Sequence, residues 1–247
     1  MKLQQKVALV TGGGSGIGAV IAQHLAEQGA KVLIIGRSEQ PLQQTAASHA
    51  NIDYFVADVA NSADIQRTIA EIHQRYGRLD ILVNNAGVAP VVALAAQNME
   101  DFDRTFAINV RGSVDCIRQS LALLKASKGS VINITSSVSS RPLATMAAYS
   151  GSKAAMTAIT KALGKELAAD GIRVNAVSVG PIETPIYQKT ALSAEQAQAH
   201  VERVSQLVPL GRFGKPEEVA TMVAFLASDE ASYITASEFA VDGGFAA

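Results

Sequence analysis

Near its amino terminus the chain reads Val7-Ala8-Leu9-Val10-Thr11-Gly12-Gly13-Gly14-Ser15-Gly16-Ile17-Gly18. The short apolar run predicts a buried β-strand, and the one-face apolar spacing from Ile17 to Gln28 predicts a helix. Glycines between a first strand and a first helix let backbone N–H groups approach a phosphate, and the helix dipole favours its charge. A flexible turn would explain the glycines alone, but their position favours a dinucleotide-binding α/β fold.

Seven short apolar runs, including this first one, recur along the chain with helical patterns between them. They are rich in β-branched residues and continuous rather than alternating, which is typical of parallel strands buried on both faces. The runs are Val7–Val10, Val32–Ile35, Tyr54–Ala57, Ile81–Val83, Val131–Ile134, Val174–Val177 and Phe239–Val241.

The segments between these runs place apolar residues on one helical face. Alternation of strands and helices predicts a doubly wound α/β fold around a parallel sheet. We find no internal repeat and no linker, so residues 1–247 are expected to form one domain. The expected helices are Ile17–Gln28, Ala63–Tyr76, Phe102–Leu124, Ala154–Leu167 and Glu217–Leu226, with another that starts near Pro41.

Composition and charge narrow the classes of protein to consider. Hydrophobic residues make up 48% of the chain and charged residues only 17%, which excludes a disordered protein. The 21 basic and 22 acidic residues give a net charge of −1, so no nucleic-acid partner and no membrane partner are expected. The low charge fraction suggests that an oligomer hides part of the surface.

Cysteine and histidine usage argue against disulfide and metal chemistry. Cys116 is the only cysteine, so no internal disulfide can form, and with no recognisable signal peptide we expect a cytoplasmic protein. The four histidines, His24, His49, His73 and His200, have no ligand-like spacing, so no metal site is predicted.

A tyrosine and a lysine lie four positions apart in the second half of the chain. The spacing places Tyr149 and Lys153 on the same side of a helix, although such a pair arises easily by chance. Reduction of a carbonyl group needs a proton on the developing oxyanion, and a phenol can supply it. A nearby cation would lower the phenol pKa from its ordinary value of about 10.

Together, these motifs resemble those of the short-chain dehydrogenase/reductase family. The glycine loop has the spacing Thr-Gly-x-x-x-Gly-x-Gly, and Asn109, Ser136, Tyr149 and Lys153 match the family's catalytic tetrad. The resemblance covers nearly the whole chain. It implies a Rossmann-type, seven-stranded parallel sheet flanked by helices. The implied activity is that of an oxidoreductase which interconverts a ketone or other carbonyl compound and a secondary alcohol.

The resemblance also assigns a role to each member of the tetrad. Tyr149 would be the general acid for reduction and the base for oxidation, and Ser136 would hydrogen-bond the substrate oxygen. Lys153 would hold the nicotinamide ribose, and Asn109 a water that links Lys153 to solvent. The serines that follow Ser136 compete for its role, but the register relative to Tyr149 favours Ser136.

The same resemblance implies which residues bind the nicotinamide dinucleotide. Asp58 and Val59 would bind adenine. The Ile182 backbone would bind the nicotinamide carboxamide, and Thr184 would contact the carboxamide or a phosphate. The full expected set is Gly12, Gly14, Ser15, Gly16, Ile17, Gly18, Arg37, Asp58, Val59, Asn85, Ala86, Gly87, Tyr149, Lys153, Ile182 and Thr184.

The end of the second predicted strand favours NADP(H) over NAD(H). An acidic residue at that position binds the ribose 2′-OH of NAD, whereas an arginine accommodates the 2′-phosphate of NADP. Here Gly36 removes the carboxylate and Arg37 supplies a planar fork suited to phosphate. Ser15 stands where many NADP-preferring relatives have a second basic residue, which weakens this prediction. The alternative interpretation of Arg37 is a solvated surface arginine.

The substrate is expected beside Tyr149, between walls formed by Val88–Leu94, Val138–Thr145 and Pro185–Leu207. The last segment suits a lid over the cofactor, about residues 185–207, although an ordinary pair of surface helices would have the same pattern. Apolar residues in these segments suggest a moderately hydrophobic substrate. The sequence shows no obvious pair of arginines for binding a substrate carboxylate or phosphate, and it leaves Arg141 and Arg203 open for this role.

Two other functions remain open at this stage. One is a 3-oxoacyl-thioester reductase acting on an acyl-carrier protein, which would usually need a basic docking patch. The other is a non-catalytic dinucleotide sensor, which would not need the tetrad. By resemblance only, we expect a homotetramer.

Overall fold

The structure, a computed structural model, describes residues 1–183 and 201–247. Within this part, seven parallel strands form one sheet in the order β3-β2-β1-β4-β5-β6-β7, which confirms the predicted fold class. The strands are β1 (Val7–Thr11), β2 (Lys31–Gly36), β3 (Ile52–Val56), β4 (Ile81–Asn84), β5 (Ser130–Ser136), β6 (Arg173–Val179) and β7 (Glu238–Val241).

The chain reverses its direction of travel across the sheet between β1 and β4. It passes from β1 through β2 to the β3 edge, then returns to β4 on the other side of β1. A crevice forms outside the carboxyl ends of the strands at such a switch point, because the flanking connections diverge there. The topology therefore places the glycine loop, which follows β1, at this crevice.

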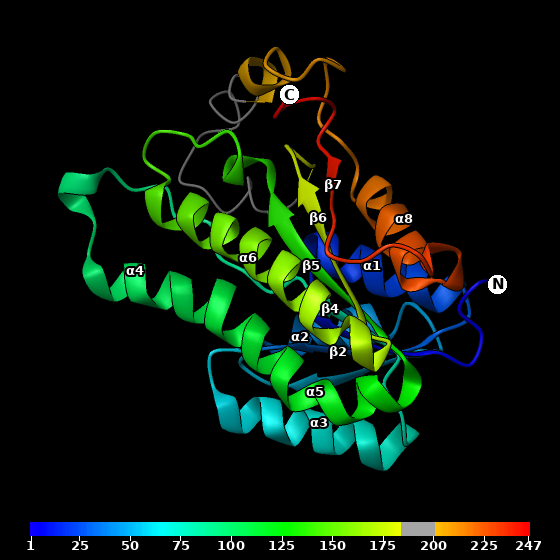
Figure 1. The fold of residues 1–247 in the computed structure, drawn as a ribbon. Helices are drawn as coiled ribbons and strands as arrows, with labels where there is room; N and C mark the ends of the chain where they lie inside the picture. The colour runs from blue at the N-terminus through cyan, green and yellow to red at the C-terminus, as the bar shows by residue number, and fades with distance from the viewer. Residues whose placement is uncertain (184–200) are drawn as a thin grey trace.

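Helices cover both faces of the sheet (Figure 1). α3, α5 and α6 lie on one face, and α1 and α8 lie on the other. Their bounds are α1 (Gly16–Glu27), α2 (Glu39–Ala46), α3 (Ser62–Tyr76), α4 (Met99–Phe106), α5 (Ser113–Ser127), α6 (Ala147–Glu166) and α8 (Pro216–Ala227).

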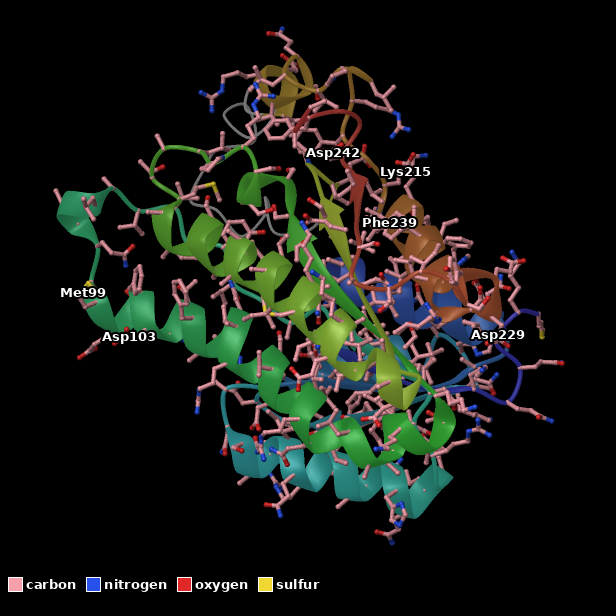
Figure 2. The ribbon with its side chains drawn as sticks, viewed as in Figure 1. Met99, Asp103, Lys215, Asp229, Phe239 and Asp242 are labelled. Atoms are coloured by element: carbon pink, nitrogen blue, oxygen red, sulfur yellow. The ribbon has the colours of Figure 1, made fainter. Side chains whose placement is uncertain are left out.

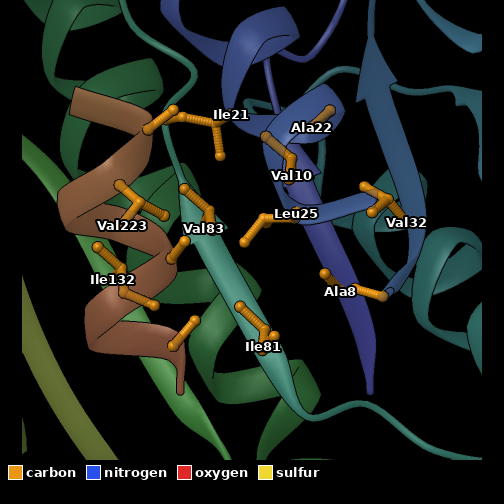
Figure 3. Close-up of a cluster of buried hydrophobic side chains, with 14 of the residues drawn as sticks. Ala8, Val10, Ile21, Ala22, Leu25, Val32, Ile81, Val83, Ile132 and Val223 are labelled. Carbon is orange, nitrogen blue, oxygen red and sulfur yellow. The ribbon is translucent and has the colours of Figure 1, made fainter. Parts of the chain in front are cut away.

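Alternate side chains of β1 enter two separate hydrophobic clusters. Ala8 and Val10 pack with Ile21 and Leu25 of α1 and Val223 of α8, as Figure 3 shows. These five side chains expose 0% of their surface, so they contribute fully to the hydrophobic free energy of folding. This cluster fixes α1 against β1 and so sets the position of the glycine loop between them.

The second cluster lies on the opposite face of the sheet. Val7 and Leu9 of β1 pack there with Cys116 and Ile117 of α5. Burial raises the pKa of the Cys116 thiol to about 12, so the thiolate is not populated at neutral pH. The single cysteine is part of the core.

Two predicted helices have different bounds in the structure. The segment expected as one helix over Phe102–Leu124 is α4, a π-helix at Ala107–Gly112, and α5. α6 begins at Ala147, seven residues before the predicted start at Ala154. The sequence did not indicate the first two turns because they contain Ser and Gly, which do not favour a helix by themselves. The earlier start places Tyr149 in the first turn of α6.

None of the helices in the described ranges is long and apolar enough to cross a membrane.

Candidate active site

The glycine loop packs directly against the segment that follows β4. Gly12 has a φ of +67°, and a Cβ at this position would lie 2.9 Å from the Ala86 Cα. A Cβ at Gly18 would lie 2.3 Å from the Gly12 carbonyl oxygen. Since both contacts are with backbone, no side-chain movement could relieve them, and the close approach requires glycine.

Hydrogen bonds from the β4 end hold this loop in place. The Thr11 hydroxyl accepts from the backbone N–H groups of Asn85 and Ala86 at 3.0 and 2.9 Å. The Asn85 amide donates to the Thr11 carbonyl at 2.9 Å. Thr11 and Asn85 therefore fix the spacing between the two walls of the crevice.

A groove of about 440 Å³ lies between these walls at the amino-terminal end of α1. Twelve of the sixteen expected cofactor residues line it, from the glycine loop, the β2 and β3 ends and the β4 end. They are Gly12, Gly14, Ser15, Gly16, Ile17, Gly18, Arg37, Asp58, Val59, Asn85, Ala86 and Gly87.

Ser38 also lines this groove, next to Arg37, and the sequence reasoning missed it. Ser38 precedes α2 at the N-cap position, yet its side chain makes no capping hydrogen bond. Glu39, the next residue, is held elsewhere, because its carboxylate accepts from the Tyr54 hydroxyl and the Gln43 amide, both at 3.2 Å. The sequence signal that could have indicated Ser38 is its position next to Arg37 and just before the helix predicted near Pro41, where serine is a common N-cap residue.

Asp58 is fixed at the end of β3 by local hydrogen bonds. Its carboxylate accepts from the Ala60 N–H at 2.9 Å, and its own N–H donates to Asp64 at 2.9 Å. The bond from Asp58 lowers the pKa of Asp64, so Asp64 holds this turn as a carboxylate at neutral pH. Gly112 of the π-helix packs on Val59, where a Cβ would lie 2.6 Å from the Val59 carbonyl oxygen.

The predicted tetrad comes together at the carboxyl end of β5. Ser136 is the last residue of β5, and its hydroxyl donates to the Val179 carbonyl at 3.3 Å. The same hydroxyl lies near enough to the phenol of Tyr149 on α6 to act on the pKa of that phenol. The Lys153 ammonium, one turn further along α6, donates to the Ile134 carbonyl at 2.7 Å and lies 5.9 Å from the centre of the Tyr149 ring. Tyr149 and Lys153 are not among the residues that line the groove.

Asn109 lies in the π-helix and connects it to two other segments. Its carboxamide accepts from the Val88 N–H and donates to the Val88 carbonyl, both at 2.9 Å. The same amide nitrogen donates to the Ser152 hydroxyl at 2.9 Å, and Ser152 donates to the Tyr149 carbonyl at 2.7 Å. Ser152 is fully buried and was missed by the sequence reasoning, although it directly precedes Lys153.

A hypothetical Cβ on Gly87 shows how tightly these residues converge. It would lie 3.2 Å from the Asn109 carboxamide oxygen and 3.6 Å from the Lys153 ammonium. Gly87 also lines the groove, so the groove and the tetrad share a wall.

Burial shifts the pKa values of both titratable members of the tetrad. It raises the pKa of Tyr149, and the nearby Ser136 hydroxyl offsets this shift only in part. It lowers the pKa of Lys153 to about 8. The expected lowering of the Tyr149 pKa by Lys153 is therefore not present in the chain alone. The ammonium is bound to the Ile134 carbonyl and lies beside the ring, so burial outweighs its charge.

The lowered pKa of Lys153 predicts a stability that rises with pH. Between about pH 8 and the ordinary lysine pKa, the unfolded chain binds more protons than the native one. The contribution of Lys153 to the free energy of unfolding should rise through this window by up to about 1.4 kcal/mol per pH unit. The raised pKa of the Cys116 thiol acts in the opposite direction, but equally in the parent and in Lys153→Met, so the difference between the two proteins reports Lys153. Lys153→Met should lack this rise. Urea unfolding of both proteins from pH 7 to pH 10 measures it, and parallel curves would contradict the prediction.

Two further expected cofactor residues, Ile182 and Thr184, follow β6 in the sequence. Ile182 is buried and pairs with Gly214 through a β-bridge, and its side chain does not line the groove. Thr184 lies outside the described residues, as does most of the expected lid over residues 185–207. At the end of that range, residues 201–205 are helical.

Across residues 1–183 and 201–247, no three His, Cys, Asp or Glu side chains are grouped so that they could hold a metal ion.

Comparison with known proteins places this arrangement in a family. A family model described as enoyl-(acyl carrier protein) reductase matches residues 12–246. The chain is 37% identical to a 3-oxoacyl-[acyl-carrier-protein] reductase of Thermotoga maritima over 249 residues, which cover 99% of both proteins. The solved structure of a short-chain dehydrogenase/reductase from Serratia marcescens matches with a TM-score of 0.92 and 34% identity over 100% of both chains. The chain is a short-chain dehydrogenase/reductase.

Other relatives show how varied the substrates of similar proteins are. This short-chain dehydrogenase/reductase is also 34% identical to a D-threitol dehydrogenase of Mycolicibacterium smegmatis, over 99% of the chain and 94% of the relative. Both relatives carry out redox chemistry between a carbonyl group and an alcohol. The chain is thus an oxidoreductase that interconverts a carbonyl compound and an alcohol with a nicotinamide dinucleotide.

Proposed function

We propose that this short-chain dehydrogenase/reductase is an NADP(H)-preferring carbonyl reductase and alcohol dehydrogenase. One observation carries the proposal, namely the convergence of Ser136, Tyr149 and Lys153 beside the wall of the glycine groove. The groove fits a dinucleotide, because glycine backbone and the amino terminus of α1 form its surface where the pyrophosphate would lie.

The bound cofactor would supply or accept a hydride, and the chain's own residues would manage the proton. Tyr149 would donate its phenolic proton to the substrate oxygen during reduction and take it back during oxidation. Ser136 would hydrogen-bond the same oxygen as its negative charge develops. Lys153 would hold the ribose hydroxyls, and Asn109 would support the water that returns protons to Lys153.

The preference for NADP(H) rests on the residues around the β2 end. Arg37 and Ser38 line the groove there, and Gly36 leaves room for a phosphate. Glu39 is the acidic residue that could repel a phosphate, but Tyr54 and Gln43 hold its carboxylate. Arginine and a free hydroxyl are suitable donors for a 2′-phosphate.

Replacing Arg37 by alanine should raise the KM for NADPH about tenfold and leave the KM for NADH nearly unchanged. The reason is that a charge-assisted hydrogen bond contributes roughly 1.5–3 kcal/mol. The additional change Gly36→Asp should reverse the preference by placing a carboxylate against the phosphate. Steady-state kinetics with both cofactors measure this, and an equal loss with both would contradict the role of Arg37.

The described rim of the site favours a small, apolar carbonyl compound. Residues 88–98 contain no charged side chain, and Val91 and Leu94 on this loop expose 67% and 85% of their surface. A hydrogen bond connects this loop to the loop of residues 137–146, which follows Ser136: the Val92 N–H donates to the Thr145 carbonyl at 2.7 Å. An uncharged rim gives a ketone substrate apolar contact and gives an acidic carrier protein little to bind.

The second candidate, a 3-oxoacyl-thioester reductase, is favoured by the identity to the Thermotoga maritima protein. A panel of aryl and alkyl ketones, secondary alcohols and acetoacetyl thioesters, each with both cofactors, separates the two. Faster turnover of simple ketones than of thioesters would support the carbonyl reductase. The reverse would support the thioester reductase, and no turnover at all would favour the dinucleotide sensor.

We also propose a homotetramer, measurable by light scattering. The outer edge of β7 has no neighbouring strand within the described chain, and a hollow of about 1120 Å³ lies between β7 and α8. An unpaired strand edge beside an apolar hollow suits pairing with a second copy.

A further inference from the structure

The carboxyl-terminal residues Asp242–Ala247, here named the tail, form a compact turn after β7. The Asp242 carboxylate accepts from the N–H groups of Gly244 and Ala246 at 2.9 and 3.0 Å. The Phe245 N–H donates to the Asp242 carbonyl at 3.1 Å. Because one side chain and its own carbonyl hold three N–H groups, the tail has a fixed shape.

The tail packs against two segments close to the expected site. A Cβ on Gly180, in the turn after β6, would lie 2.5 Å from the Asp242 Cα. A Cβ on Gly243 would lie 2.7 Å from Val208, and the Leu210 N–H donates to the Gly243 carbonyl at 3.2 Å. Figure 2 places Asp242 at the carboxyl ends of β6 and β7, which is the end of the sheet that carries Ser136.

The tail also contacts the loop of residues 137–146, which follows Ser136. Arg141 donates from its guanidinium to the Phe245 carbonyl, and the same group lies 4.8 Å from the centre of the Phe245 ring. Phe245 is the third residue from the end of the sequence, and it is only 3% exposed. The backbone of Arg141 is fixed as well, because its N–H donates to the Ser137 carbonyl at 2.9 Å.

The guanidinium of Arg141 is therefore engaged with the protein itself. The sequence alone left Arg141 open as a receptor for an anionic substrate. Its ring contact and hydrogen bond instead connect the loop of residues 137–146 to the tail. A charge-assisted hydrogen bond together with a cation–π contact is enough to hold an exposed loop in one position.

We propose that this Arg141–Phe245 contact, named the clasp, positions the loop of residues 137–146 as a wall of the substrate site. Arg141 and Phe245 are then positioning residues that set the affinity for the carbonyl substrate. The proposal rests on the proposed function, because it assigns the substrate to the space beside Ser136 and Tyr149. It extends that function by making the tail part of substrate selection.

The proposal predicts a selective effect on KM. Arg141→Leu and Phe245→Ala should each raise the KM for a ketone substrate about tenfold, with kcat within threefold and the NADPH dissociation constant within twofold. Arg141→Lys should recover part of the loss, because it keeps the charge. The double variant should be no worse than Arg141→Leu alone, since Arg141→Leu already removes both the hydrogen bond to the Phe245 carbonyl and the ring contact, whereas Phe245→Ala removes only the ring contact. Arg104→Leu, which removes an exposed arginine on α4, is the matched control.

A second readout does not depend on catalysis. Amide hydrogen exchange of residues 137–146 should be at least tenfold faster in Arg141→Leu and Phe245→Ala than in the parent and in Arg104→Leu. Unchanged exchange in this loop, or an unchanged KM, would overturn the clasp even if the enzyme reduces ketones. Faster exchange in a protein that turns over no ketone would leave the clasp as a loop-positioning contact and reject the proposed function instead.

Discussion

Replacing Tyr149 by phenylalanine should lower kcat at least a hundredfold and leave the dissociation constant for NADPH within twofold. The change removes only the phenolic hydroxyl, which is the proposed proton donor. A positioned general acid contributes roughly 10²- to 10⁴-fold to the rate. Tyr149 does not line the glycine groove, so cofactor binding should survive. Stopped-flow turnover and fluorescence titration of NADPH measure the two quantities.

The loss should be specific to this tyrosine. Tyr233→Phe is the matched control, because Tyr233 is fully exposed and lies with Lys6, Ser130 and Arg173 at the opposite end of the sheet. It should keep full activity. A Tyr149→Phe enzyme that keeps near-normal turnover would refute the proposed mechanism. A variant that loses NADPH binding as well would show that the hydroxyl has a structural role instead.

The central strands could be predicted from sequence because they are buried on both faces. All residues of β1 and β5 are buried, and the apolar runs Val7–Val10 and Val131–Ile134 mark these strands in the sequence. At the sheet edge the signal is weaker. β3 begins at Ile52, two residues before the expected start. The prediction began later because Asp53 interrupts the apolar run. Asp53 accepts a hydrogen bond from Tyr76, a long-range partner that no local pattern reveals.

The interruption between α4 and α5 could not be predicted from periodicity. The π-helix exists because tertiary contacts stabilise it, and π-turns inside α-helices are often found at functional sites. Asn109 bonds both backbone groups of Val88, and Gly112 packs on Val59. These partners are more than 20 residues away, so sequence spacing predicts one continuous helix.

Site residues that belong to short motifs were predictable, and those that act through distant partners were not. The glycine loop and the pair Tyr149 and Lys153 have fixed local spacing. Ser152 and Arg141 gain their importance only from Asn109 and Phe245, which are 43 and 104 residues away. The sequence indicates which chemistry is present, and the fold determines which polar groups support it.

Replacing Gly18 by alanine should weaken NADPH binding about a hundredfold and lower the free energy of unfolding by about 2 kcal/mol. The added Cβ would lie 2.3 Å from the Gly12 carbonyl oxygen, so α1 and the glycine loop must move apart. Overpacking of this kind typically costs 1–3 kcal/mol. A shift of about 1 Å in groups that bind a ligand can cost a factor of about 10². Isothermal titration of NADPH and urea unfolding measure the two effects.

Gly151→Ala is the control, because it adds the same methyl group to a helix where the nearest atom, in Phe106, would lie 3.6 Å away. That variant should bind NADPH normally and be slightly more stable, since alanine favours a helix over glycine by about 1 kcal/mol. Comparing Gly18→Ala with Gly151→Ala shows whether an effect comes from where the methyl group is added or from adding a methyl group at all. Normal NADPH binding by Gly18→Ala would mean that the loop can open without loss. In that case the close contact between Gly18 and Gly12 would not be what shapes the groove for the pyrophosphate.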